Sequence, residues 1–310
     1  MSPSRRQFLL GAGATALGAQ FDADTISSVF TADYEFKVGY HTITWGDKTE
    51  QAVDEISELG FRGVAIRRSD YEKYANRAAG FRDLMAAKKL TVVSIATGDV
   101  TINPSAEKQE IADCVAMAKW MKEAGGLYLE ATDNARAKVG VNDHDDYKKL
   151  GRRLTEIGKR AFGEYGVKLG YHNRMNSLGE GRQEVDRVMD ATDPKHVWAA
   201  IDIAHMQTAG GDPVRFTRDY INRLVYPYFK DVLIQKTQSG LDGRPLKPKY
   251  DFVELGQGVV NIPGALQIMK DFRYTGWIII ELDRAPAGRT PKESAVISKK
   301  FVEERLKLKV

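Results

Sequence analysis

Short apolar segments alternate with helix-like segments from Tyr34 onward, and this alternation constrains the fold more than any other feature of the sequence. The strand-like segments cover residues 36–45, 62–68, 90–98, 127–133, 167–174, 196–202, 224–234 and 276–283. Helical periodicity covers 52–61, 71–89, 106–124, 144–165, 181–191, 213–223, 262–272 and 291–307. Eight strand–helix repeats predict a single-domain α/β fold, a (β/α)8 TIM barrel over residues 35–310. The alternative is an open doubly wound sheet, which the lack of a glycine-rich nucleotide-binding motif after any strand disfavours.

Composition excludes several classes of protein. The 310 residues are 43% hydrophobic and 28% charged, which is enough to bury a sizeable core. A formal net charge of +4 is small for this length and gives no reason to expect a nucleic-acid partner. The single cysteine, Cys114, excludes an intrachain disulfide and a CxxC zinc site. No long apolar run follows the N-terminus, so we expect no membrane contact in the mature protein.

The N-terminus resembles an export signal. Arg5 and Arg6 precede an apolar run rich in glycine and alanine, as in twin-arginine signal peptides. An ordinary N-terminal helix is the alternative, but the glycine content disfavours it. We therefore predict a twin-arginine signal peptide over residues 1–19, a linker over 20–34, and export to the bacterial periplasm or beyond by the twin-arginine machinery.

Polar side chains follow several of the predicted strands. They are His41 and Trp45; Glu130 and Asp133; His172, Asn173 and Arg174; Asp202 and His205; Tyr228, Lys230 and Asp231; and Glu281 and Asp283. The carboxyl ends of barrel strands meet at one face, where the active sites of such barrels lie. Carboxylates and histidines that converge there predict a divalent-metal site or acid–base chemistry.

Each of these residues also has a structural interpretation. Asp202 closes a buried strand, VWAAI, so it either pairs with a ligand at the barrel mouth or caps the segment that follows. His205 either joins the site or packs locally. Arg174 is either a surface cation or a contact to an anion or a sugar hydroxyl.

Longer motifs carry a resemblance to a known family. YHNRMNS, EVDRVMDATDP, AAIDIAHMQTAGGDP, YFKDV, ELGQGVVNIPGAL and GWIIIELD resemble segments of the xylose isomerase-like TIM barrels, a superfamily often labelled sugar phosphate isomerase/epimerase. The resemblance is strongest to the inosose dehydratase branch. It extends from about Phe36 to the C-terminus, so it covers nearly all of the predicted mature chain.

The resemblance implies a divalent metal, with Mn²⁺ the first candidate. By position its ligands fall on His172, Asp202, Tyr228 and Glu281. The family usually has histidine where this chain has Tyr228, and a neutral phenol is a poor ligand for such an ion. We therefore predict His172, Asp202 and Glu281 as the metal ligands.

Three further positions bear on the metal. Ala65 stands where the second strand of the family often carries glutamate, and Arg174 stands where the dehydratase branch has histidine. Glu130 is available to complete the coordination sphere. Alternatively, Arg174 and Lys230 replace the charge of the metal.

The family's chemistry is enolisation next to a ketone. A base removes the α proton while a cation stabilises the enediolate. We predict Glu130, His172 and Glu281 as candidate bases, with Lys230 and His205 as candidate electrophilic helpers. The predicted substrate contacts are His41, Trp45, Arg174, His205 and Tyr228.

The sequence thus predicts an exported isomerase or epimerase that acts on a carbohydrate, a keto-sugar or an inosose-like ketone. Two alternatives stay open: a lyase or hydratase acting on 3-keto-glycosides or inososes, and a barrel that binds carbohydrate without catalysis. An apurinic endonuclease is disfavoured by the predicted export and the weak charge. A homo-oligomer is an open alternative to a monomer.

Overall fold

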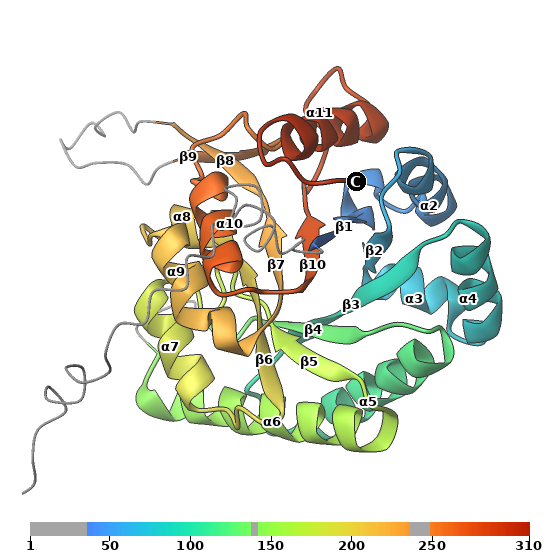
Figure 1. Cartoon of the computed structure of the whole chain (residues 1–310). Coiled ribbons are helices and arrows are strands. Elements are labelled where there is room, and N and C mark those ends of the chain that lie inside the picture. The colour runs from blue at the N-terminus through green and yellow to red at the C-terminus, as the bar shows by residue number, and fades with distance from the viewer. Residues whose placement is uncertain (1–35, 138–141, 236–248) are drawn as a thin grey trace, which may run out of the picture. The chain divides into compact units, whose positions relative to one another are not determined.

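The computed structural model describes residues 36–137, 142–235 and 249–310. The predicted signal peptide and linker lie outside the described residues. Eight parallel strands close into a barrel in the order β1-β10-β7-β6-β5-β4-β3-β2. The helices surround the strands (Figure 1), so the predicted TIM barrel is confirmed.

The barrel strands are short and buried. They are β1 (Phe36–His41), β2 (Gly63–Ile66), β3 (Thr91–Val100), β4 (Tyr128–Asp133), β5 (Lys168–Tyr171), β6 (Val197–Asp202), β7 (Leu224–Phe229) and β10 (Gly276–Ile280). Because helices cover their outer face and side chains fill their inner face, these strands are continuous apolar runs. That is why their positions could be predicted from the sequence.

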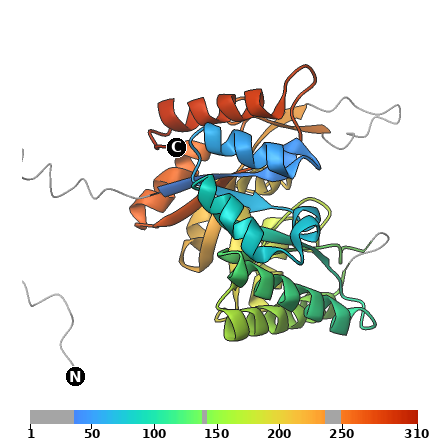
Figure 2. The ribbon, with the colours of Figure 1, turned by 90° about the vertical axis from the view of Figure 1, so that its right-hand side faces the viewer.

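The helices follow the predicted order. They are α2 (Thr49–Glu58), α3 (Arg68–Tyr74), α4 (Ala78–Ala87), α5 (Glu107–Glu123), α6 (His144–Tyr165), α7 (Arg182–Asp190), α8 (Ile203–Thr208), α9 (Pro213–Tyr220), α10 (Ile262–Asp271) and α11 (Pro291–Glu304), with 3-10 turns η1 (Thr42–Trp45) and η2 (Ile221–Arg223). The last helix, α11, lies beside α2 and closes the ring of helices (Figure 2). Among the described residues, no helix is both long and apolar enough to cross a membrane.

Two predicted elements divide. The strand expected over 36–45 ends at His41, because His41 Nδ1 accepts the Ile43 N–H and turns the chain into η1. The helix expected over 71–89 is two helices, α3 and α4, separated at 75–77. Arg77, the residue before α4, has ψ of 39°, which is not helical.

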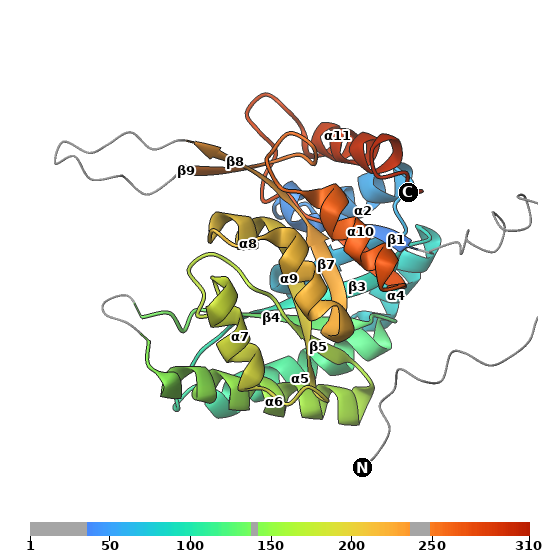
Figure 3. The same cartoon turned by 60° about the vertical axis from the view of Figure 1, so that its left-hand side comes forward.

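The segment expected as one strand over 224–234 also divides. β7 ends at Phe229, and β8 (Asp231–Gln235) pairs antiparallel with β9 (Lys249–Val253) outside the barrel. The Asp231 carboxylate accepts backbone N–H groups of Val232, Gly256, Gly258 and Val260, which fixes the chain where it leaves the barrel. The β8–β9 hairpin extends beyond the end of β7 (Figure 3).

Apolar side chains fill the interior of the barrel below the site. A cluster of Ala65, Val93, Ala200, Val225, Tyr226, Tyr228, Trp277 and Ile279 fills the interior. A Cβ on Gly63 would lie 2.4 Å from the Trp277 ring, so only glycine leaves room for that indole. Ala65, where the family often has glutamate, is part of this apolar packing.

Candidate active site

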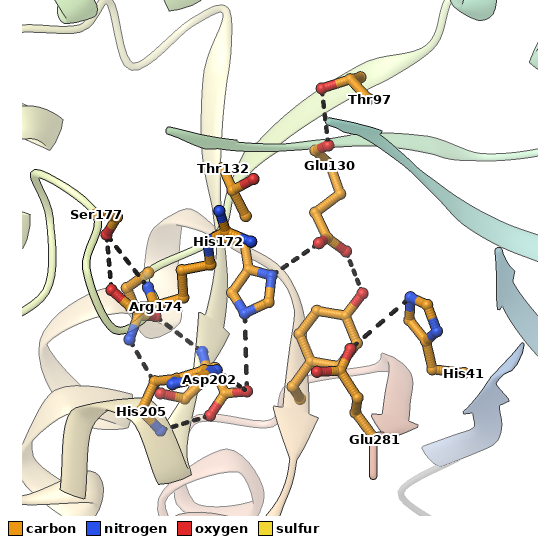
Figure 4. A network of polar contacts seen from close by, with 12 residues as sticks. His41, Thr97, Glu130, Thr132, His172, Arg174, Ser177, Asp202, His205 and Glu281 are labelled. Carbon is orange, nitrogen blue, oxygen red and sulfur yellow. Dashed lines mark hydrogen bonds and ion pairs between the residues drawn. The ribbon is translucent and has the colours of Figure 1, made fainter. Parts of the chain in front are cut away.

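A polar cavity of about 700 Å³ lies at the carboxyl ends of the barrel strands. Its lining includes seven of the predicted site residues: His41, Glu130, His172, Arg174, His205, Lys230 and Glu281. Figure 4 shows most of these side chains pointing toward one another from different strands. The face of the barrel on which they meet is the one on which TIM-barrel active sites lie.

Glu130 holds His172. Glu130 lies within β4 and His172 directly follows β5, and Glu130 Oε1 lies 2.7 Å from His172 Nδ1. Tyr226 donates its hydroxyl to Glu130 Oε2 at 2.7 Å, and Tyr228 donates to the same oxygen. Glu130 therefore has a hydrogen-bond donor on each carboxylate oxygen, and it is 3% exposed.

The pKa values of Glu130 and His172 are shifted more by nearby charges and hydrogen bonds together than by burial. Burial acts to raise the pKa of Glu130, but the charge and hydrogen bond of His172, with help from His41 and Tyr228, lower that pKa to about 2. Burial acts to lower the pKa of His172, but Glu130, Asp202 and Glu281 raise it to about 10. An ionised Glu130 thus fixes the proton of His172 on Nδ1.

Asp202 has two separate tasks. Its Oδ1 accepts the N–H groups of Ala204 and His205, both at 2.8 Å, and so caps α8. Its Oδ2 is buried and has no hydrogen-bond partner among the residues that the structure describes. It lies 3.7 Å from His172 Nε2, which is likewise buried and without a hydrogen-bond partner in this part of the chain. Asp202 therefore caps the following segment with Oδ1, and its Oδ2 is available to a ligand at the barrel mouth.

Asp202 Oδ2 and His172 Nε2 are placed so that a cation could bind between them. The raised pKa of His172 keeps a proton on Nδ1, toward Glu130, and a second proton on Nε2, toward Asp202 Oδ2. A metal ion bound between Nε2 and Oδ2 would take the place of that second proton. His205 Nε2 lies 4.0 Å from Asp202 Oδ2, and the ligand atoms of the three residues lie within 4.8 Å of one another. Two imidazoles and a carboxylate are a donor set that divalent transition metals accept.

The protonation of His205 bears on that fit. Burial lowers the pKa of His205 to about 3; Asp202 opposes this shift while Lys230 and His172 add to it. The ring is therefore neutral, as ligation requires. A donor faces each ring nitrogen: the Met175 N–H lies 3.3 Å from Nδ1 and the Lys230 ammonium lies 3.4 Å from Nε2. A neutral ring accepts from only one of them, and ligation through Nε2 requires the proton on Nδ1.

Glu281 is paired with a lysine rather than grouped with those three residues. Lys230 Nζ lies 2.8 Å from Glu281 Oε1 and 2.6 Å from Asp283 Oδ1. Burial acts to lower the pKa of Lys230, but Glu281, Asp202 and Asp283 raise it well above its usual value, so the ammonium stays charged. Glu281 Oε2 lies 3.7 Å from His41 Nε2, which carries the proton of a neutral ring because Nδ1 accepts the Ile43 N–H.

Two predicted substrate contacts do not line this cavity. Trp45 is buried in η1, where its indole N–H donates to Glu55 at 2.6 Å and its ring packs edge-on against Tyr40. Tyr228 is fully buried under the cavity, with its hydroxyl on Glu130. Tyr228 stands where the family usually has a histidine, and its hydroxyl is already engaged in this hydrogen bond to Glu130. Arg174 does line the cavity and pairs with Asp99 at 2.5 Å.

Sequence reasoning missed three charged or aromatic residues of the cavity lining. Asp99 belongs to β3, which runs two residues beyond the predicted strand and so brings this carboxylate to the cavity. Arg67 directly follows β2 at the same face. Phe252 comes from β9, for which the sequence offered no clear strand signal, and its ring lies 4.2 Å from Lys230 Nζ.

Comparison with known proteins identifies the family. A family model described as a xylose isomerase-like TIM barrel matches residues 53–304, which is most of the chain. The chain belongs to this family. Among curated relatives, it is 30% identical over 299 residues to an inosose dehydratase of Clostridium tetani (strain Massachusetts / E88), covering 87% of this chain and 97% of the relative.

Solved structures of other proteins share the fold of this chain. A D-tagatose 3-epimerase-like protein superposes with a TM-score of 0.69 at 17% identity, covering 88% of this chain and 97% of that one. The IolI protein, in a structure with a bound zinc atom, has a TM-score of 0.68 at 16% identity, covering 87% and 97%. At these identities the similarity shows the fold alone. The resemblance inferred from the motifs is confirmed.

Proposed function

We propose that this protein is a lyase that eliminates water, or another group on the β carbon, from a polyhydroxylated cyclic ketone. The observation that carries the proposal is the pair of unpartnered buried atoms, His172 Nε2 and Asp202 Oδ2, at a cavity that also holds Lys230 and Glu281. The relative named inosose dehydratase is matched over nearly its whole length, which favours elimination over the isomerase or epimerase that the motifs suggested.

His172, Asp202 and His205 would hold a divalent ion, with Mn²⁺ as the first candidate from the family resemblance. The ion would supply Lewis-acid stabilisation for the enediolate oxygen. Glu130 supports this arrangement by fixing the His172 tautomer, as carboxylates next to metal-binding histidines do.

Glu281 is the base that we propose for the α proton. Glu130 is unsuited, since its pKa is lowered to about 2 and its oxygens are occupied by three donors. Glu281 lines the cavity, and its Oε2 has no donor within hydrogen-bond distance among the described residues. Lys230 would stabilise the negative charge that develops next to it, and His41 Nε2–H would donate to the departing oxygen.

The test is proton exchange in deuterated water with a keto-inositol, with and without Mn²⁺. We expect wild type to exchange the α proton and to release one water, as measured by NMR and mass spectrometry. Glu281→Gln should reduce exchange by about 100-fold or more, as loss of a general base does. Exchange without loss of water would identify an isomerase or epimerase, and binding without exchange would identify a non-catalytic barrel.

A further inference from the structure

A second cavity of about 720 Å³ adjoins the site cavity. It lies between β9 and the segment 283–287 that follows β10. Phe252 and Asp283 line both cavities. The boundary between the two spaces is therefore formed by an aromatic ring and a carboxylate.

That boundary is anchored on the charged lysine of the site. The Phe252 ring lies 4.2 Å from Lys230 Nζ and 4.9 Å from the His205 ring, and Asp283 accepts from Lys230 at 2.6 Å. A molecule bound in the second cavity would thus be one side chain away from the groups that we assign to the reaction. A single ligand could reach from one cavity into the other.

The lining of the second cavity suits a neutral polyol. Tyr250 and Phe252 offer aromatic faces, and Asp251, Asp283 and Arg284 offer both acceptors and donors. Aromatic faces pack against the C–H face of a ring, while charged side chains hydrogen-bond its hydroxyls. One arginine against two carboxylates gives no net positive charge, which disfavours an anionic ligand such as a phosphate ester.

The volumes of the two cavities also favour a ligand larger than one six-membered ring. Each alone falls within the ~300–1,000 Å³ typical of pockets for drug-sized ligands, so a single six-membered polyol leaves the second cavity unused. We infer that the second cavity is a subsite for a second sugar ring, joined through an oxygen to the β carbon of the ketone-bearing ring. The substrate class is then a keto-glycoside. This inference rests on the elimination proposed above.

The chemistry balances without a further reactant. The base takes the α proton, and the electrons of that C–H bond form the carbon–carbon double bond. The bond from the β carbon to the bridging oxygen breaks, and this oxygen leaves with the electron pair. It then takes a proton and becomes a hydroxyl of the released second ring, while the first ring becomes an unsaturated ketone.

Two probes separate the subsite from the reaction. 3-Keto-cellobiose carries a second ring on the bridging oxygen, whereas methyl 3-keto-β-glucoside has the same ketone-bearing ring with only a methyl group there. We expect wild type to show a kcat/KM for the disaccharide at least about tenfold above that for the methyl glycoside. Equal values in wild type would overturn the inference.

Filling the second cavity should remove that preference. Ala285 lines this cavity and is partly buried, so Ala285→Trp should abolish the preference while changing the methyl glycoside constant by less than about twofold. Arg284→Ala should reduce the preference in the same direction. Ala79→Trp, on the exposed face of α4, is the matched control and should retain it. A preference that survives in Ala285→Trp would refute the subsite.

Failure of the subsite and failure of the proposed function give different results. If neither the two probes nor the keto-inositol exchange an α proton, the proposed elimination is wrong, but calorimetric binding of the two probes to wild type and Ala285→Trp still decides the subsite. Tighter binding of the disaccharide that Ala285→Trp abolishes would support it. Equal binding of both probes would contradict it.

Discussion

We propose that Glu130 acts through His172 rather than on a substrate. It is buried, it accepts from both Tyr226 and Tyr228, and it fixes the His172 proton on Nδ1. Removing its charge should therefore weaken the ability of His172 to ligate a cation without removing a ligand. This role differs from that of the base for which the family resemblance made Glu130 a candidate.

Glu130→Gln should lower Mn²⁺ affinity and turnover by about 10- to 100-fold, the usual cost of losing a carboxylate behind a metal-binding histidine. Calorimetric Mn²⁺ titration measures the first effect and keto-inositol exchange the second. Tyr226→Phe is the control, because it removes one donor to Glu130 and keeps the charge, so its effect should be smaller. Unchanged Mn²⁺ affinity in Glu130→Gln would contradict this role.

The sequence predicted the position of a site residue best where that residue lies at or just after the end of a barrel strand. His41, His172, Asp202 and Glu281 are placed by the boundary of an apolar run, which the sequence shows directly. Trp45 was misplaced because a side chain–backbone bond at His41 turns the chain early, and such a local bond leaves no periodic signal. Phe252 was missed because its strand lies outside the barrel.

At the scale of elements, helix ends with clear caps were predicted best. The helix expected over 144–165 has the same bounds as α6, which begins after a capping box at Asp143 and Asp146 and ends at Gly166 with φ of 72°. The hairpin β8–β9 was not predicted. Three of the four backbone N–H groups that Asp231 binds, those of Gly256, Gly258 and Val260, lie 25, 27 and 29 residues further along the chain. Contacts of that kind become visible only in the folded chain.

Asp70 joins three elements on the amino-terminal side of the chain. It is fully buried at the start of α3 and accepts from Thr49 at 2.6 Å, Thr42 at 2.8 Å and the Arg67 N–H at 2.9 Å. Burial opposes ionisation, but these hydrogen bonds and the Arg67 charge lower the pKa of Asp70. A lowered pKa in the folded state means that the carboxylate stabilises the fold above the pKa of the unfolded chain.

This stabilisation should be lost as the pH falls through the folded-state pKa. Asp70→Asn should reduce the free energy of unfolding by about 1–3 kcal/mol at pH ~7, and the difference from wild type should narrow below pH ~4. Denaturant unfolding at both pH values measures it. Asp47→Asn, at an exposed position, is the control and should have little effect. A difference that stays constant with pH would contradict the assignment.

At the scale of the whole molecule, export remains a proposal based on Arg5 and Arg6, which lie outside the described residues. If these arginines are read by the twin-arginine machinery, replacing both with lysine should leave the protein in the cytoplasm. Cell fractionation with a periplasmic and a cytoplasmic marker measures the outcome. Export of the double variant at the wild-type level would refute the signal peptide.

One carboxylate in this barrel connects ligand binding to local unfolding. Asp202 caps the first turn of α8 with one oxygen and faces the proposed cation with the other, so that turn cannot open freely while an ion is held. Amide hydrogen exchange at Ala204 and His205 should therefore slow when Mn²⁺ is added. At an ion concentration of about 100 times Kd the opening becomes ~2.7 kcal/mol less favourable, or about 100-fold slower exchange. These two amides would then report occupancy of the site in the absence of any substrate.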